Sequence, residues 1–423
     1  MAAVLLLAAN STAAADGPLT MATTTVAHDL APPNATLVVA SPLTSDVAAP
    51  RADELSQRVA NLVASAIGPS GRVAPHPMTL AAARALSSRS AALLFVDVRV
   101  EGGELRLTSD LYPVVGNGWD RIRAPAPPPS KHSFVHVRVA AEVRAYLTPI
   151  HLERARVTRF AQDIGTVLAV LCGDVEGGTG NALVVVTQGE IAWGHLAGGR
   201  FVATRRAAAS SIGRRAPTPM REPLASLALT EGDTPTLYVG WTGRSGAGLG
   251  SDLGVRSRIS GLPVPSASRV LCLVPNSAKA GFDALVDCAD GQPTEGVAPV
   301  PLFDAWSEAD ISRPDGEHVR VVAARDPLAT LHLVRGSESL TVDGVGAEVA
   351  LGDLDQDGVV EVVTTTTRGD DALVVSSWRA SGLVERLRIA APRGVDAVAV
   401  CPADANDAPA VVAAVGPEIW LVH

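Results

Sequence analysis

The residues in this sequence best suited to chemistry are a run of acids at positions 352–361, which read GDLDQDGVVE. Counted from Asp353, side-chain carboxylates occur at positions 1, 3, 5 and 9, and glycine at position 6. Ca²⁺ takes about six to eight oxygen ligands, and alternating aspartates in a tight loop point their oxygens inward. Gly358 permits the sharp turn, and acids this close repel one another without a cation. The pattern predicts a Ca²⁺ site, with Mg²⁺ as the alternative ion and a solvated acidic turn as the alternative without an ion.

The loop departs from the EF-hand, because strand-like segments flank it and Thr364 stands where an EF-hand has its last glutamate. Asp-x-Asp-x-Asp-Gly-x-x-Glu between two short apolar strands resembles the FG-GAP or VCBS repeat of integrin-like β-propellers. The resemblance implies one Ca²⁺ held between strands of a blade. The ligands it implies are Asp353, Asp355, Asp357, the carbonyl of Val359, and Glu361, where the family usually has aspartate.

The segment around this loop belongs to a unit that recurs from about residue 150: a strand, a polar loop, a strand, a tight turn and a third strand. Clear copies occupy residues 167–193, 349–378 and 397–422, and weaker copies start near Leu227, Val270 and Val319. A repeat of roughly 40–50 residues with three or four strands is typical of a β-propeller. Six first strands predict about six blades, with five possible, over residues 150–423 of a mainly β chain.

The ends of this region and its cysteines give further expectations. Residues 151–160 precede the first full unit, and we expect them to supply the missing outer strand of the last unit, because a propeller leaves no raw edge. Cys272 and Cys288 flank a hairpin turn and are predicted to form a disulfide, or else to be two buried small residues. Cys172 and Cys401 occupy the same place in the first and last units and are expected to be buried and unpaired.

The amino-terminal part predicts a small α/β domain over residues 35–121. Leu55, Val59, Leu62 and Val63 form a helix stripe, within the order strand, helix, strand, helix, strand, strand. Pairing such a domain with a propeller resembles TolB-like envelope proteins, in element order and domain arrangement. Residues 122–149 are predicted to be a Pro-rich linker and connecting segment.

The first residues indicate export. Residues 1–15 combine a short apolar core with Ala13-Ala14-Ala15 and are predicted to be a signal peptide, although no Lys or Arg precedes Arg51. Residues 16–34 are expected to be a flexible lead-in. The expected location is periplasmic, outer-envelope-associated or secreted.

Composition narrows the function. The net charge of −9 argues against nucleic acid as a partner, and apolar runs are too short for a transmembrane span after the amino terminus. No nucleophile elbow or phosphate-binding loop occurs, so the chain is not expected to be an enzyme. The hypothesis is an exported envelope scaffold or binding protein with a protein partner; the alternative is a hydrolase or lyase acting at the central funnel of the propeller.

Overall fold

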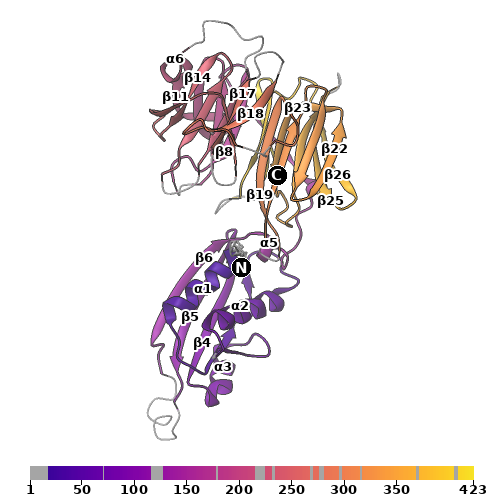
Figure 1. Cartoon of the computed structure of the whole chain (residues 1–423). Helices are drawn as coiled ribbons and strands as arrows, with labels where there is room; N and C mark the ends of the chain where they lie inside the picture. Colours follow the sequence, from indigo (N-terminus) through magenta and orange to yellow (C-terminus); the bar gives the residue numbers. More distant parts are fainter. Residues whose placement is uncertain are drawn as a thin grey trace, which may run out of the picture.

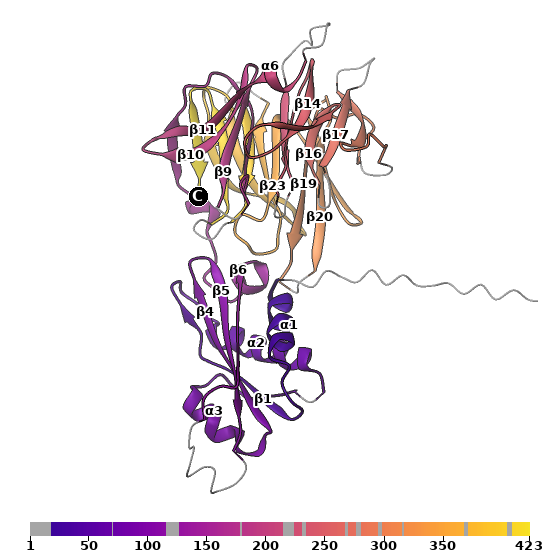
Figure 2. The same cartoon turned by 90° about the vertical axis from the view of Figure 1, so that its left-hand side faces the viewer.

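The computed structural model describes residues 18–69, 71–115, 127–177, 180–214, 224–230, 234–266, 270–275, 281–294, 298–314, 317–367, 371–403 and 408–423. The predicted signal peptide and part of the Pro-rich segment lie outside these residues. Figures 1 and 2 show two bodies joined through α5: an α/β domain, and a propeller-like ring of small sheets. The chain is therefore mainly β, with a small α/β domain first, as the sequence predicts.

The α/β domain is one sheet with helices on both faces. Its strands run in the order β3-β1-β4-β5-β6; β1 is parallel to β3 and β4, and β5 and β6 are antiparallel additions. Helices α1 and α2 cover one face, and α3 contributes to a smaller core on the other. The elements are β1 (Thr36–Ala40), β2 (Thr44–Ser45), α2 (Ala52–Ile67), β3 (Gly71–Val73), α3 (Leu80–Leu86), η1 (Ser87–Arg89), β4 (Ala92–Glu101) and β5 (Glu104–Pro113), then β6 and α5. Between Thr36 and Pro113 the structure has the predicted order strand, helix, strand, helix, strand, strand, with the short β2 in addition.

Two expectations for the flanks of this domain are wrong. The lead-in is not flexible throughout, because Pro18–Leu30 forms helix α1, whose Leu19, Val26 and Leu30 are buried against the domain. Spacings of seven and four put these side chains on one face. Residues 122–149 are not merely a linker. Within them β6 (Lys131–Arg138) completes the sheet and α5 (Ala141–Arg144) packs beside it.

Among the described residues, the ring contains five sheets. One has eight strands in the order β27-β28-β29-β7-β11-β10-β9-β8, one has three (β16-β17-β18), and three have four each (β12–β15, β19–β22, β23–β26). The elements are η2 (Leu152–Arg154), β7 (Val157–Ala161), β8 (Val167–Gly173), β9 (Ala182–Thr187), β10 (Glu190–Ala197), β11 (Arg200–Ala208), α6 (Ala209–Ile212), β12 (Ala225–Leu229), β13 (Leu237–Trp241), β14 (Arg244–Leu249), β15 (Val255–Ile259), β16 (Leu262–Pro265), β17 (Val270–Pro275), β18 (Phe282–Asp287), β19 (Ala305–Ser312), β20 (His318–Arg325), β21 (Thr330–Arg335), β22 (Glu338–Asp343), β23 (Val345–Gly352), β24 (Glu361–Thr366), β25 (Ala372–Arg379), β26 (Gly382–Ala390), β27 (Ala397–Cys401), β28 (Ala410–Val415) and β29 (Glu418–Val422).

The ring is closed by β7, as predicted for residues 151–160. This strand pairs antiparallel with β29, so the start of the propeller supplies the outer strand of its last unit. Through the single parallel pair Arg200–Ala161, β7 also joins β11. The first and last units therefore share the eight-stranded sheet, and the count of hydrogen-bonded sheets differs slightly from the predicted number of blades.

All four cysteines are paired. The predicted disulfide between Cys272 and Cys288 is present, with a Cα–Cα distance of 5.0 Å. The expectation that Cys172 and Cys401 are unpaired is wrong, because they form a second disulfide with a Cα–Cα distance of 4.8 Å. Their equivalent places in the first and last units become adjacent when the ring closes, since β8 lies beside β27. None of the helices in the described segments is long and apolar enough to cross a membrane.

Candidate metal centre

The acidic loop lies between β23 and β24, and its backbone amides donate hydrogen bonds to its own aspartate side chains. Oδ1 and Oδ2 of Asp353 accept hydrogen bonds from the amides of Asp357 and Gly358, each at 3.0 Å. The turn needs left-handed backbone at Gln356 (φ 55°) and at Gly358 (φ 81°), a conformation that glycine adopts without penalty. These contacts hold the loop in a shape that brings separate carboxylates together.

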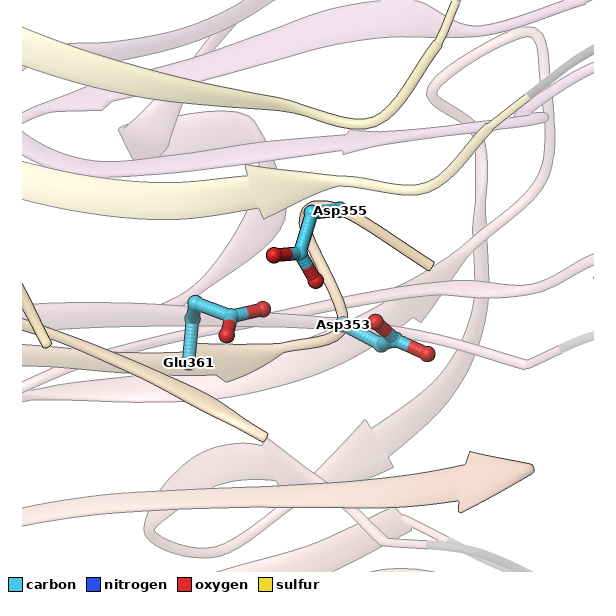
Figure 3. A group of neighbouring side chains, drawn as sticks. All are labelled: Asp353, Asp355 and Glu361. Carbon is cyan, nitrogen blue, oxygen red and sulfur yellow. The ribbon is translucent and has the colours of Figure 1, made fainter. Parts of the chain in front are cut away.

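Three carboxylates converge in this loop (Figure 3). One oxygen each of Asp353, Asp355 and Glu361 lies within 4.8 Å of the others. Asp355 is 5% exposed and Glu361 0%. Glu361 is held in place, because its Oε2 accepts from the Leu354 amide at 2.8 Å and its Oε1 from Ser377 Oγ at 2.9 Å. In contrast, Oδ1 of Asp355 is buried and accepts no hydrogen bond from the residues that the structure describes.

The environment of these acids disfavours their charged forms. Burial is the main cause, and the negative charge of neighbouring carboxylates adds to it. Together they raise the pKa of Asp353 to about 7, that of Asp355 to about 6 and that of Glu361 to about 9. A site built from such groups ionises fully only when a positive charge is supplied, and a hard cation with oxygen ligands supplies it.

The structure brings together three of the five ligands implied by the sequence. The carboxylate of Asp357 lies outside this set of three: its Oδ1 accepts from the Val359 amide at 2.8 Å, and its Oδ2 lies 3.2 Å from Nη2 of Arg379. Its charge is still close enough to help raise the pKa of Asp355. The role of the Val359 carbonyl stays a prediction. Figure 3 shows Asp353 and Asp355 on the loop and Glu361 at the start of β24. The three carboxylates therefore come from both the loop and the strand that follows it.

The sequence did not point to the basic residues near this loop. Nη1 of Arg386 lies 3.5 Å from Oδ2 of Asp355 and donates to Ser377 Oγ at 3.0 Å. The same guanidinium forms an ion pair with Glu153 in η2. Burial lowers the pKa of Arg144, and the charges of Asp353 and Asp355 oppose that shift. These partners come from segments far apart in the sequence, so no local motif announces them.

A separate cavity of about 620 Å³ runs between the inner strands of the ring. Many of the residues that line it are apolar, and several charged side chains reach it. Glu308 is paired with Arg320 through two contacts of 2.8 Å and accepts from Ser266 Oγ at 2.9 Å. Asp304 is paired with Arg325. Glu348 also lines the cavity, and burial together with the nearby carboxylates of Asp396 and Asp371 raises its pKa to about 8.

Comparison with known proteins adds little. No family model and no curated protein matches the chain. Among solved structures, two crystal structures of BBS1N in complex with ARL6DN, one soaked with mercury and one with lead, are similar at 11% identity. They cover 76% of this chain and 88% and 87% of theirs. At a TM-score of 0.38 the likeness supports no argument about the function of this chain.

Proposed function

We propose that this protein is an exported scaffold or binding protein of the cell envelope whose propeller presents loops to a protein partner and is stabilised by one Ca²⁺. The observation that carries the cation is Oδ1 of Asp355, a buried carboxylate oxygen that lacks a hydrogen-bond donor among the described residues and lies beside two further carboxylates. A buried, unsatisfied carboxylate oxygen is costly, and a bound cation removes that cost.

The residues of the loop fit a hard cation. Asp353, Asp355 and Glu361 would hold Ca²⁺, with Asp357 and the Val359 carbonyl as the further ligands implied by the FG-GAP or VCBS resemblance. The ion would supply charge neutralisation rather than chemistry. In this proposal the site is structural, because it stiffens the sheet β23–β26 from the edge at which the loop turns.

Export is supported by the disulfides. The four cysteines form two disulfides, and such bonds persist in oxidising compartments such as the periplasm or the cell exterior. The pairing of an α/β domain with a propeller, similar to TolB-like envelope proteins, agrees with that location.

The binding role is supported by how the charges of the central cavity are used. Glu308 forms an ion pair with Arg320, and Asp304 forms one with Arg325. These ion pairs give the two carboxylates a structural role in the wall of the cavity. In contrast, Leu328 is 87% exposed in the turn between β20 and β21. We propose that this turn is one of the loops that the propeller presents to its partner.

The Ca²⁺ site is tested by thermal unfolding of the full chain with Ca²⁺ and with EDTA. A ligand at 100 times its Kd stabilises by about 2.7 kcal/mol, so Ca²⁺ should raise the Tm by a few degrees. Asp355→Asn should abolish that rise, and Asp53→Asn, at an exposed position in α2, should keep it. A melting curve that chelation leaves unchanged in the wild-type chain would rule the site out.

One observation favours the alternative, a hydrolase or lyase acting at the funnel. Glu348 combines access to the cavity with a pKa raised to about 8, which suits a general acid near neutral pH. Loss of a measured hydrolase or lyase activity in Glu348→Gln, with folding intact, would establish this alternative.

A further inference from the structure

We infer that the acidic loop also docks the amino-terminal domain onto the propeller, so that Ca²⁺ binding sets the relative orientation of the two domains. The inference rests on the proposed Ca²⁺ site and extends it from local stiffening to control of domain arrangement. Its physical basis is Gln356, a residue that the ligand motif treats only as a spacer.

Gln356 joins the loop to the other domain. Its Nε2 donates to the Val139 carbonyl at 2.8 Å, and its Oε1 accepts from Nε and Nη2 of Arg144 at 3.0 and 2.6 Å. Val139 follows β6, and Arg144 ends α5, so both partners belong to the amino-terminal domain. Figure 1 shows α5 at the junction of the domain and the ring. Both ends of the Gln356 amide thus hold the two parts together.

The position of Gln356 depends on the neighbouring ligands. It stands between Asp355 and Asp357 and is 8% exposed. Its φ of 55° is unfavourable for a residue with a side chain, so the surrounding loop must impose it. A change in the placement of Asp355 therefore moves the side chain that contacts Val139 and Arg144.

The charges at the junction also couple Ca²⁺ binding to the contact between the two domains. Arg144 is half-buried and is stabilised by the charges of Asp353 and Asp355, while Arg386 bridges Asp355 and Glu153. With Ca²⁺ bound, the ion neutralises the converging carboxylates and the loop is fixed. Without Ca²⁺, the converging carboxylates lose the ion that joins them, and only the hydrogen bonds of the loop and the two arginines hold them. The loop then relaxes, and Gln356 loses its fixed position against the domain.

The test measures the distance between the domains in the full chain. Leu86→Cys in α3 and Leu328→Cys in the propeller place one spin label on each body; these side chains are 47% and 87% exposed. The native cysteines are all in disulfides, so only the introduced thiols react. Pulsed electron–electron double resonance measures the distance between the two labels with Ca²⁺ and with EDTA. Ca²⁺ binding is measured separately by calorimetry.

We expect a single narrow distance distribution with Ca²⁺ and one at least twice as broad with EDTA. Gln356→Gly removes the three contacts and suits the left-handed backbone, so this variant should bind Ca²⁺ within about threefold of wild type and stay broad even with Ca²⁺. Gln188→Gly, in an exposed turn after β9, is the matched control and should behave as wild type.

The outcomes separate the two proposals. If the wild-type chain binds no Ca²⁺, the proposed cation site fails and this inference fails with it. If Ca²⁺ binds but leaves the distance distribution unchanged, only the domain coupling is overturned. A narrow distribution for Ca²⁺-bound Gln356→Gly would also overturn it.

Discussion

Glu348 is the single residue whose surroundings give the clearest pH dependence. Its carboxyl accepts a hydrogen bond from the Val398 amide, and Arg325 is nearby, but burial and the charges of Asp396 and Asp371 outweigh both. They raise its pKa from 4.5 to about 8. Between these two values the folded protein holds a proton that the unfolded chain has released.

This difference predicts that Glu348 lowers stability as the pH rises. Stability falls with pH wherever the folded state binds more protons, so the contribution of Glu348 should decrease from about pH 5 to about pH 8. Glu348→Gln keeps a neutral side chain and should exceed wild type by on the order of 1 to 3 kcal/mol at pH 8. At pH 4 the two should differ little. Urea unfolding at both pH values measures this.

The comparison with wild type cancels the other groups that titrate in both proteins. Glu101→Gln, an exposed substitution in the amino-terminal domain, should leave the pH dependence as it is. Parallel pH profiles for wild type and Glu348→Gln would show that the carboxyl ionises normally in the folded protein.

At the same scale, the sequence predicted the acids of the loop better than their surroundings. Asp353, Asp355 and Glu361 converge because their spacing along a tight turn is enough to bring them together. Asp357 could not be judged this way, since Arg379 attracts its carboxylate from another strand. Gln356 was beyond prediction, because its partners lie more than 200 residues away in the sequence and carry no motif.

Among the elements, helix α1 was missed because its composition suggested a flexible segment although its apolar residues have helical spacing. Residues 18–30 are rich in Thr and Ala and suggest a flexible segment, yet Leu19, Val26 and Leu30 are fully buried. The helix is also fixed at its start, because the Leu19 amide donates to Oε2 of the buried Glu142 at 2.9 Å. The elements of residues 35–121 were predictable because each has a clear period and a clear stop, whereas α1 depends on a distant sheet.

If α1 is an integral part of the domain, truncating its buried face should be costly. Leu30→Ala removes a fully buried side chain and should lower the free energy of unfolding by about 2 to 5 kcal/mol. Met21→Ala, at a position 54% exposed on the same helix, should change it by less than about 0.5 kcal/mol. Chemical denaturation followed by circular dichroism distinguishes the two. Equal, small effects would mean that α1 is not docked.

On the scale of the whole molecule, the closing strand was predictable and the second disulfide was not. A repeat that ends at a third strand must take its outer strand from elsewhere, and β7 was the unassigned extended segment. The pairing of Cys172 with Cys401 requires knowing that the first and last units touch at that level of the ring. The first strands of consecutive units are neighbours around the ring, but those of the first and last units, β8 and β27, become neighbours only because the ring closes.

The two disulfides should differ in how much they stabilise the folded protein. Cys172–Cys401 spans 229 residues and Cys272–Cys288 spans 16. Closing a longer loop removes more entropy from the unfolded chain, which gives about 5 kcal/mol for the long loop and about 3 for the short one in the chain-entropy model. The double variant Cys172→Ala and Cys401→Ala should accordingly lose about 2 kcal/mol more than Cys272→Ala and Cys288→Ala, measured by urea unfolding under non-reducing conditions. Because β7 still pairs with β29, the first variant should fold as a closed ring of lower stability. A smaller loss than in the second variant would show that the strand pairing alone determines closure and that the disulfide adds nothing to it.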